Sequence, residues 1–316
     1  MRSSLTQQES AAISYLRVVA MGSIVFCHFL QALESNWAWV FNIGVQIFLL
    51  ISGYLYGHKH IEGWISWFCK RIIRIYVPFV LFLIAVIPIY AVSGKITAKQ
   101  IIIYMLDLQG ILGGVKGLGH LWFLTAIALC YSITPILQKS RRWAKYLIWL
   151  VVATAVIIFV IFPNYGYQSS WIILYVLGYY LTLAPKIAKN LLVVLGVGIM
   201  TWLLLHFSWE LMKDMHSGWS MAFHCTGAFL VVICFLFFYS LLKKCYKPKV
   251  IRVLDKYSFQ IYIVHHILIM PPFGMLLLTE WVPLNMIIIA FYIVFYALTL
   301  TVVSDKVVEK LVKKYV

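Results

Sequence analysis

Residues Ile75–Gly94 read IYVPFVLFLIAVIPIYAVSG and contain no charged side chain. A helix of about 20 mostly apolar residues crosses the hydrocarbon core of a bilayer, because each residue adds about 1.5 Å to its length. The segment Lys70–Arg74 directly before it holds two arginines and a lysine. An apolar run behind a short basic cluster is typical of a transmembrane helix that begins on the cytoplasmic side.

The composition extends this interpretation to the whole chain. Its 316 residues are 63% hydrophobic and only 11% charged, whereas a soluble domain has about 25% charged residues. This composition nearly excludes a soluble enzyme, and it leaves no room for a sizeable soluble domain beside the spans. We predict a single all-α membrane domain over residues 1–316, with a short cytoplasmic segment at 1–12 and a cytoplasmic tail at 305–316.

Charge-free stretches predict about ten transmembrane helices packed as a bundle. They are Val18–Leu33, Ser35–Gly57, Ile75–Gly94, Gly117–Gln138, two helices within Tyr146–Pro185, Asn190–Trp209, Met215–Leu242, Tyr257–Thr279 and Trp281–Ser304. The stretch Thr97–Val115 contains Lys99, Asp107 and several glycines. It is too polar for a span, and we expect an interfacial or re-entrant segment there.

The basic residues favour one orientation of this bundle. The formal net charge is +16. Placing both termini in the cytoplasm puts 22 Lys and Arg inside and 4 outside, while the acidic residues divide evenly, 5 and 5. A bias confined to basic residues is what the positive-inside rule describes. We therefore expect a multi-pass protein of the cytoplasmic (inner) membrane, whose basic clusters contact lipid headgroups and not nucleic acid.

Two ionisable side chains fall within or beside the first span. Arg17 and His28 are 11 residues apart, so they share a helical face and are separated by about 16 Å along the axis. An ionisable group inside a membrane is costly and is a candidate for function. The alternatives are a topology anchor for Arg17 and a helix–helix hydrogen bond for His28.

Arg71 and Arg74 are i,i+3 neighbours before the third span, so they share a face. Two adjacent guanidinium groups repel each other unless an anion lies between them, and their geometry matches phosphate. The alternative is a solvated cluster that fixes topology.

Other polar side chains mark the fourth and ninth spans. His120 precedes Trp122 at the outer end of the fourth span, where interfacial anchoring is the alternative to a functional role. Ser258, Tyr262 and His265 in the ninth span are spaced by 4 and 3 residues and share a face. Interhelical hydrogen bonding is the alternative for these three. No pattern of His or Cys predicts a metal site.

Five short motifs occur in order along the chain. They are SYLR at 14–17 followed by Cys27-His28, the run Gly44–Tyr54 ending in Ser-Gly-Tyr, RIIRIYVP at 71–78, HLWFL at 120–124 followed by Tyr131, and the run Ser258–His265. Together these motifs resemble the membrane acyltransferase-3 family of bacterial integral-membrane O-acyltransferases. The resemblance spans most of the chain.

The resemblance implies transfer of an acyl group, most often acetyl, from cytoplasmic acyl-CoA to a hydroxyl of a cell-surface polysaccharide or its lipid-linked precursor. Acetyl-CoA would be a substrate, and no permanently bound cofactor is expected. Many members of the family have an acidic residue where this chain has Ser14. The chain ends in a short basic tail and so resembles the members that lack an esterase-like domain.

The resemblance also implies roles for individual residues. His28 would be the base or would carry the acyl group, and both alternatives stay open. Arg17 would act with it, and the CoA phosphates would bind Arg17, Arg71 and Arg74. Candidates for the oxyanion or acceptor site are Ser52, His120, Trp122, Ser258, Tyr262 and His265.

The alternative function is a non-enzymatic transporter of a glycan intermediate or an anionic metabolite. It accounts equally well for the apolar bulk, the intramembrane histidines and the basic clusters. It does not account for five motifs in order.

Overall fold

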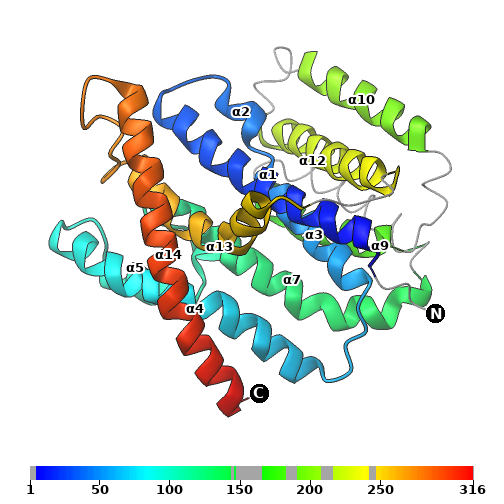
Figure 1. Cartoon of the computed structure of the whole chain (residues 1–316), viewed down its shortest axis with the longest axis horizontal. Helices are drawn as coiled ribbons and strands as arrows, with labels where there is room; N and C mark the ends of the chain where they lie inside the picture. Colours follow the sequence, from blue (N-terminus) through cyan, green and yellow to red (C-terminus); the bar gives the residue numbers. More distant parts are fainter. Residues whose placement is uncertain are drawn as a thin grey trace. The chain divides into compact units, whose positions relative to one another are not determined.

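The computed structural model describes residues 5–143, 146, 166–182, 191–207, 216–241 and 247–315. The chain is helical throughout most of these ranges, and no β-strand occurs in them. Figure 1 shows the helices in chain order: α1 (Gln7–Ala32), α2 (Ala38–Phe41), α3 (Gly44–Gly57), α4 (Trp64–Val92), α5 (Ala98–Met105), α6 (Gln109–Leu112), the 3-10 turn η1 (Gly119–Leu121), α7 (Trp122–Lys139), the 3-10 turn η2 (Ser140–Trp143), α9 (Gly166–Leu181), α10 (Leu191–Phe207), α12 (His216–Leu241), α13 (Lys249–Ile269) and α14 (Val282–Tyr315).

Six helical stretches among the described residues are long and apolar enough to cross a membrane. They are Gln7–Ala32, Ala38–Gly57, Trp64–Val92, Gly119–Trp143, Ala222–Leu241 and Val282–Lys313. The all-α membrane class is therefore confirmed. The count of ten spans and the side of each terminus stay predictions, and the first helix expected within Tyr146–Pro185 lies outside the described residues.

The ends of three helices differ from the sequence-based expectation. The first helix begins at Gln7 and not at Val18, because Thr6 and Glu9 form a reciprocal capping pair that starts it early. The last helix runs to Tyr315, so most of the tail expected at 305–316 is helical. The ninth predicted span ends at Ile269, just before two prolines that cannot continue a helix.

The segment expected to be interfacial or re-entrant forms two short helices. α5 has 8 residues and α6 has 4, and neither is long enough to cross a bilayer. Thr97 caps α5 in a capping box with Gln100. Asp107 lies between the two helices at a φ of 54°, a left-handed conformation that Asp adopts more readily than most residues. The segment is confirmed as non-spanning.

The chain divides into two compact units. Unit 1 comprises residues 1–20, 42–61 and 133–255, and unit 2 comprises residues 21–41, 62–132 and 256–316. In unit 1, α3 packs along α9, and α12 packs against α3, α9 and α10. In unit 2, α4 packs against α14. Both units contain part of α1 and part of α13.

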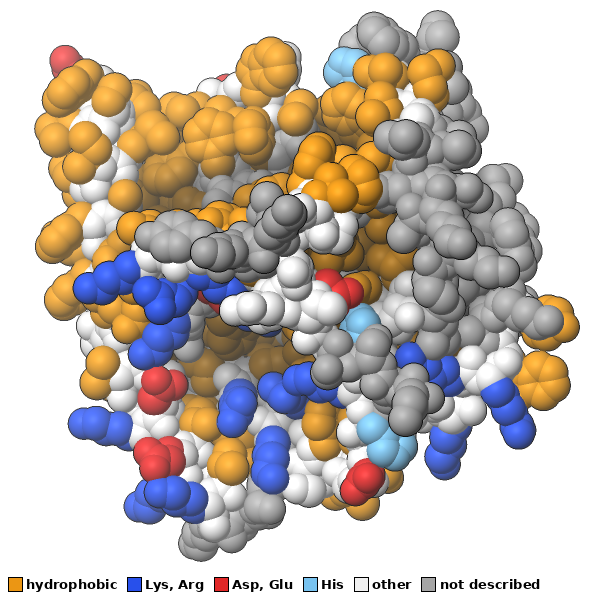
Figure 2. Space-filling view, turned by 45° about the vertical axis from the view of Figure 1, so that its right-hand side comes forward, with side chains coloured by type: hydrophobic (Ala, Val, Ile, Leu, Met, Phe, Trp, Pro, Cys, Tyr) orange, Lys and Arg blue, Asp and Glu red, His pale blue; other side chains and the backbone are white. Residues whose placement is uncertain are grey.

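Many large apolar side chains are exposed in unit 2, including Val92 at 92% and Phe291 at 67% exposure. Soluble proteins rarely expose such surfaces over wide areas, whereas lipid covers them in a membrane. Figure 2 shows broad areas of hydrophobic side chains on the face that it draws, with Lys and Arg side chains gathered away from them. This surface fits a bilayer environment.

The backbones of α3 and α9 touch in unit 1. A Cβ added to Gly53 would lie 1.9 Å from the Tyr175 carbonyl oxygen, and one added to Gly178 would lie 2.0 Å from the Leu50 carbonyl oxygen. Small residues allow this close approach between membrane helices. The two glycines therefore fix how α3 and α9 pack.

We predict that Gly178→Ala lowers the thermal stability of the detergent-solubilised protein, because the added methyl group forces the two helices apart. Overpacking of this kind costs about 1–3 kcal/mol. The matched control is Gly196→Ala on α10, where an added Cβ meets nothing within 4 Å. Equal midpoints for the two variants would contradict the proposed close contact.

Candidate active site

The side chains of His28, His120, His265 and His266 meet in unit 2, and we call them the histidine cluster. The ring centroids of His28 and His266 are 4.5 Å apart, and those of His28 and His265 are 5.3 Å apart. His120 stacks on His266 at 4.5 Å with the ring planes 13° apart, and it lies 5.2 Å from His265. Residues far apart in the sequence thus form one polar site within an apolar unit.

Hydrogen bonds fix the tautomers of two of these imidazoles. Nδ1 of His28 lies 2.6 Å from Oε1 of Gln31, and Nδ1 of His266 lies 2.8 Å from the Gly117 carbonyl oxygen. Both partner atoms are oxygens, which only accept hydrogen bonds, so in this arrangement Nδ1 carries the hydrogen in each ring. The Nε2 atoms of His28 and His266 are therefore the basic nitrogens.

The other two imidazoles each have a nitrogen without a partner. Nε2 of His120 donates to the Ile263 carbonyl oxygen at 2.9 Å, and Nδ1 of His265 donates to the Tyr262 carbonyl oxygen at 2.7 Å. Nδ1 of His120 and Nε2 of His265 are buried and make no hydrogen bond. A buried polar atom without a partner costs about 1–3 kcal/mol. Both nitrogens can accept a hydrogen bond from a ligand that has donors.

Reciprocal hydrogen bonds join η1 to α13. The Tyr262 hydroxyl donates to the His120 carbonyl oxygen, while the His120 ring donates to the carbonyl oxygen of Ile263. A further donor comes from Gln109, whose Nε2 lies 2.8 Å from the Leu121 carbonyl oxygen. Because the Tyr262 hydroxyl hydrogen is engaged in this way, the residue holds His120 in place, and acting as an oxyanion donor would require that bond to break.

Asp107 supports the start of α7 from outside the candidate spans. Its carboxylate accepts hydrogen bonds from Nε2 of Gln109 at 2.8 Å and from Oγ1 of Thr125 at 3.1 Å. Burial raises the pKa of Asp107 to about 6, against the opposing effect of these two hydrogen bonds. The carboxyl group therefore titrates within the experimentally accessible range.

The described part of the chain holds no group of three or more His, Cys, Asp or Glu side chains with a geometry suited to a metal ion.

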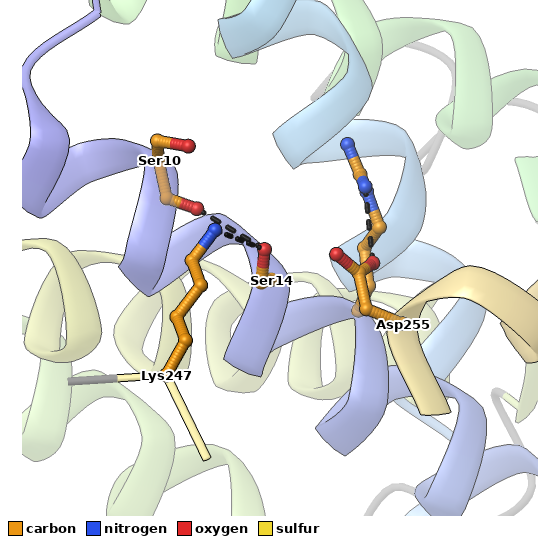
Figure 3. Close-up of polar contacts among 5 residues, drawn as sticks. Ser10, Ser14, Lys247 and Asp255 are labelled. Atoms are coloured by element: carbon orange, nitrogen blue, oxygen red, sulfur yellow. Dashed lines mark hydrogen bonds and ion pairs between the residues drawn. The ribbon is translucent and has the colours of Figure 1, made fainter. Parts of the chain in front are cut away.

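Arg17 forms a second polar site, in unit 1. Its Nη1 lies 3.0 Å from Oδ1 of Asp255, and the two side chains are 34% and 17% exposed (Figure 3). One turn earlier, Ser14 accepts a hydrogen bond from Nζ of Lys247 at 2.8 Å and donates to the Ser10 carbonyl oxygen at 3.2 Å. The carboxylate that Ser14 cannot provide thus reaches Arg17 from α13.

The remaining predicted site residues are distributed over both units. Arg71 and Arg74 lie near the start of α4, the first half-buried and the second exposed. Trp122 begins α7 beside His120, and Ser258 is buried on α13. Ser52 lies on α3 in unit 1 and is not part of the histidine cluster.

The family model described as an acyltransferase domain (Acyl_transf_3) matches residues 10–304. The chain belongs to the acyltransferase-3 family. No curated protein and no solved structure matches it. The matched region includes both polar sites, so the histidine cluster and the Arg17–Asp255 pair are features of a membrane acyltransferase.

Three residues of this acyltransferase were missed by the sequence analysis. His266 was not among the predicted site residues, yet the rings of His28 and His120 both lie 4.5 Å from its ring. Gln31 gave no signal beyond its spacing of three from His28. Asp255 did give one, because it is the single acidic residue in the basic stretch Lys243–Lys256.

We predict that the contribution of Asp107 to the stability of the acyltransferase falls as the pH rises from about 4 to about 6. The pKa of Asp107 is higher in the folded protein than its ordinary value of 3.8, so the stabilising effect of its proton is complete below the ordinary value and is lost as the pH rises through about 6. Asp107→Asn, which keeps an oxygen acceptor and tolerates the left-handed backbone, should flatten this dependence. Melting temperatures of the two proteins across the range are the measurement, and parallel curves would refute the role of Asp107.

Proposed function

We propose that this protein is a membrane O-acyltransferase that moves an acyl group, acetyl in the first instance, from cytoplasmic acyl-CoA to a hydroxyl of a cell-surface polysaccharide or its lipid-linked precursor. The observation that carries the proposal is the histidine cluster, in which Nδ1 of His28 is bound to Gln31 and its Nε2 is left basic. Acyl transfer to a hydroxyl requires such a base or nucleophile near neutral pH, and imidazole is the side chain suited to it.

The unpartnered nitrogens of the cluster support a hydroxyl-bearing acceptor. Nδ1 of His120 and Nε2 of His265 are acceptors without donors. A sugar offers several hydroxyl donors, whereas a phosphate or a carboxylate offers acceptors only. This feature favours a glycan over the anionic metabolite of the transporter alternative.

The donor side of the proposal rests on the arginines. Acyl-CoA carries several phosphates, and guanidinium groups bind phosphate with two parallel hydrogen bonds. Arg71 and Arg74 are neighbours near the start of α4. Arg17 is paired with Asp255 through one nitrogen, and a guanidinium with five N–H groups keeps further donors for a phosphate. No permanently bound cofactor forms part of the proposal.

The proposed orientation follows from the charges. Both termini and the basic stretch Lys243–Lys256 are placed in the cytoplasm, in the inner membrane of a bacterium, because this assignment puts 22 of the 26 Lys and Arg inside. The arginines near the start of α4 are then on the side where acyl-CoA is found. Ser52 and Ser258 stay as candidates for oxyanion donors.

We predict that His28→Gln abolishes acyl transfer without impairing insertion into the membrane. A neutral amide can keep hydrogen bonds but cannot take up a proton or form a reactive acyl-imidazole, so turnover should fall by at least about 10²-fold. The measurement is release of free CoA from radiolabelled acetyl-CoA by purified protein in nanodiscs, per unit of folded protein. The control is His60→Gln, an exposed histidine outside the helices.

The same assay separates the two functions. A wild-type protein that releases no CoA and acquires no label would favour the transporter. Near wild-type turnover by His28→Gln would move the chemistry to another member of the histidine cluster.

We predict that Arg71→Ala and Arg74→Ala raise the apparent KM for acetyl-CoA more than they lower kcat. Each lost charge-assisted hydrogen bond is worth about 1.5–3 kcal/mol, so KM should rise about ten- to hundredfold per variant. Lys310→Ala, which removes an exposed cation from α14, is the control for general loss of positive charge. An unchanged KM in both arginine variants would assign these residues to topology alone.

A further inference from the structure

We propose that His266 is a second base, which takes the proton of the acceptor hydroxyl while His28 carries the acyl group. This inference rests on the proposed function and deepens it, because it selects the acyl-histidine route over direct transfer. It also gives a chemical role to a residue that the five sequence motifs leave out.

The ring of His266 packs against the ring of His28. Its ring meets that of His28 edge to face at 4.5 Å and 81°, closer than the ring of His265 at 5.3 Å. Both His28 and His266 hold their hydrogen on Nδ1, by way of Gln31 and Gly117 respectively. The two rings are thus prepared in the same tautomer, each with Nε2 as its basic atom.

The backbone that orients His266 is itself tightly held. Gly117 has a φ of +85°, and a Cβ added there would lie 2.2 Å from the Tyr90 hydroxyl oxygen and 2.8 Å from Cδ of Pro272. A larger residue would force a rearrangement there, and this close packing supports the Gly117 carbonyl oxygen that accepts from His266. A fixed acceptor keeps the Nδ1 hydrogen in place whether or not Nε2 is protonated.

The acyl-histidine route, which we call the relay, requires this second base. In the first step Nε2 of His28 attacks the thioester carbonyl carbon; a C–N bond forms, the C–S bond breaks, and CoA leaves as a thiolate that solvent protonates. In the second step the acceptor oxygen attacks the acyl carbon; a C–O bond forms and the C–N bond breaks. The acceptor proton cannot go to Nε2 of His28, because that atom still carries the acyl group.

Nε2 of His266 takes this proton and returns it to solvent, so the sum is thioester plus alcohol giving ester plus thiol. In direct transfer, by contrast, Nε2 of His28 never carries the acyl group, so it can take the acceptor proton without a second base. A second imidazole at 4.5 Å is required only by the relay.

His266 suits this role better than the other two members of the cluster. His265 is fully buried, whereas His266 keeps 8% of its surface exposed. The ring of His120 donates to the Ile263 carbonyl oxygen and stacks on His266, while the backbone carbonyl of His120 accepts from Tyr262. His120 and His265 each keep one unpartnered ring nitrogen as a hydrogen-bond acceptor beside the His28–His266 pair.

The test is a stage-resolved assay with radiolabelled acetyl-CoA and water as the acyl acceptor, using the full chain in nanodiscs. His266→Asn keeps an amide N–H near the position of Nδ1, and so preserves the bond to Gly117, but it lacks the basic Nε2. We expect it to release about one CoA per protein in a first burst, to accumulate label on the protein, and to turn over about 10²-fold more slowly than wild type. Hydroxylamine, which attacks acyl-imidazoles without a base, should restore its turnover.

Three matched variants make the result decisive. His28→Gln should show neither burst nor label, His60→Gln should match wild type, and His266→Gln, which moves the amide toward the position of Nε2, should stay slow. Wild-type turnover by His266→Asn would overturn the proposal. So would loss of the first CoA burst in His266→Asn, or the absence of radiolabel on the protein in every active variant. If wild type releases no CoA with water but does so when a sugar acceptor is added, direct transfer holds and this proposal fails. Release of no CoA with either acceptor would instead contradict the proposed function.

Discussion

The pair of hydrogen bonds between η1 and α13 is the interaction on which the candidate active site depends. The Tyr262 hydroxyl donates to the His120 carbonyl oxygen, and the His120 ring donates to the Ile263 carbonyl oxygen. Each bond satisfies a polar group that would otherwise be buried without a partner, which is costly in an apolar surrounding. Together they set the position of His120 relative to His265 and His266, and so they create the cluster into which His28 projects.

The two polar sites obey the same constraint, one with a pair of charged groups and the other with neutral rings. In unit 1 the guanidinium of Arg17 is offset by the carboxylate of Asp255, and in unit 2 neutral imidazoles are each held by an oxygen acceptor. A membrane protein with so few charged residues retains such groups only where partners exist for them. Each site is thus a group of polar side chains in apolar surroundings whose positions are set by hydrogen bonds. An acyltransferase requires such fixed positions to align a donor with an acceptor.

The sequence predicted the class of fold and most of the cluster, for identifiable reasons. Apolar runs and basic clusters are local patterns, so the helical spans of α4 and α14 followed from them directly. His28, His120 and His265 stood out because an ionisable side chain in an apolar run is rare. His266 stands in the same apolar run but outside the motif, and Asp255 in a basic stretch, and the role of each comes from a contact with α1 that the local sequence does not specify. The early start of α1 depends on a capping pair, and the end of α13 depends on two prolines. A hydropathy profile contains neither signal.

The Gln31 side chain gives the site a property beyond holding a ring in place. An amide presents an oxygen on one side and an NH2 group on the other, and the oxygen faces Nδ1 of His28. A half-turn about the last side-chain bond would face the NH2 group to the same nitrogen, and the imidazole hydrogen would then move to Nε2. His28 would lose its nucleophilic lone pair without any movement of the backbone. One glutamine rotamer thus selects between a reactive and an unreactive imidazole.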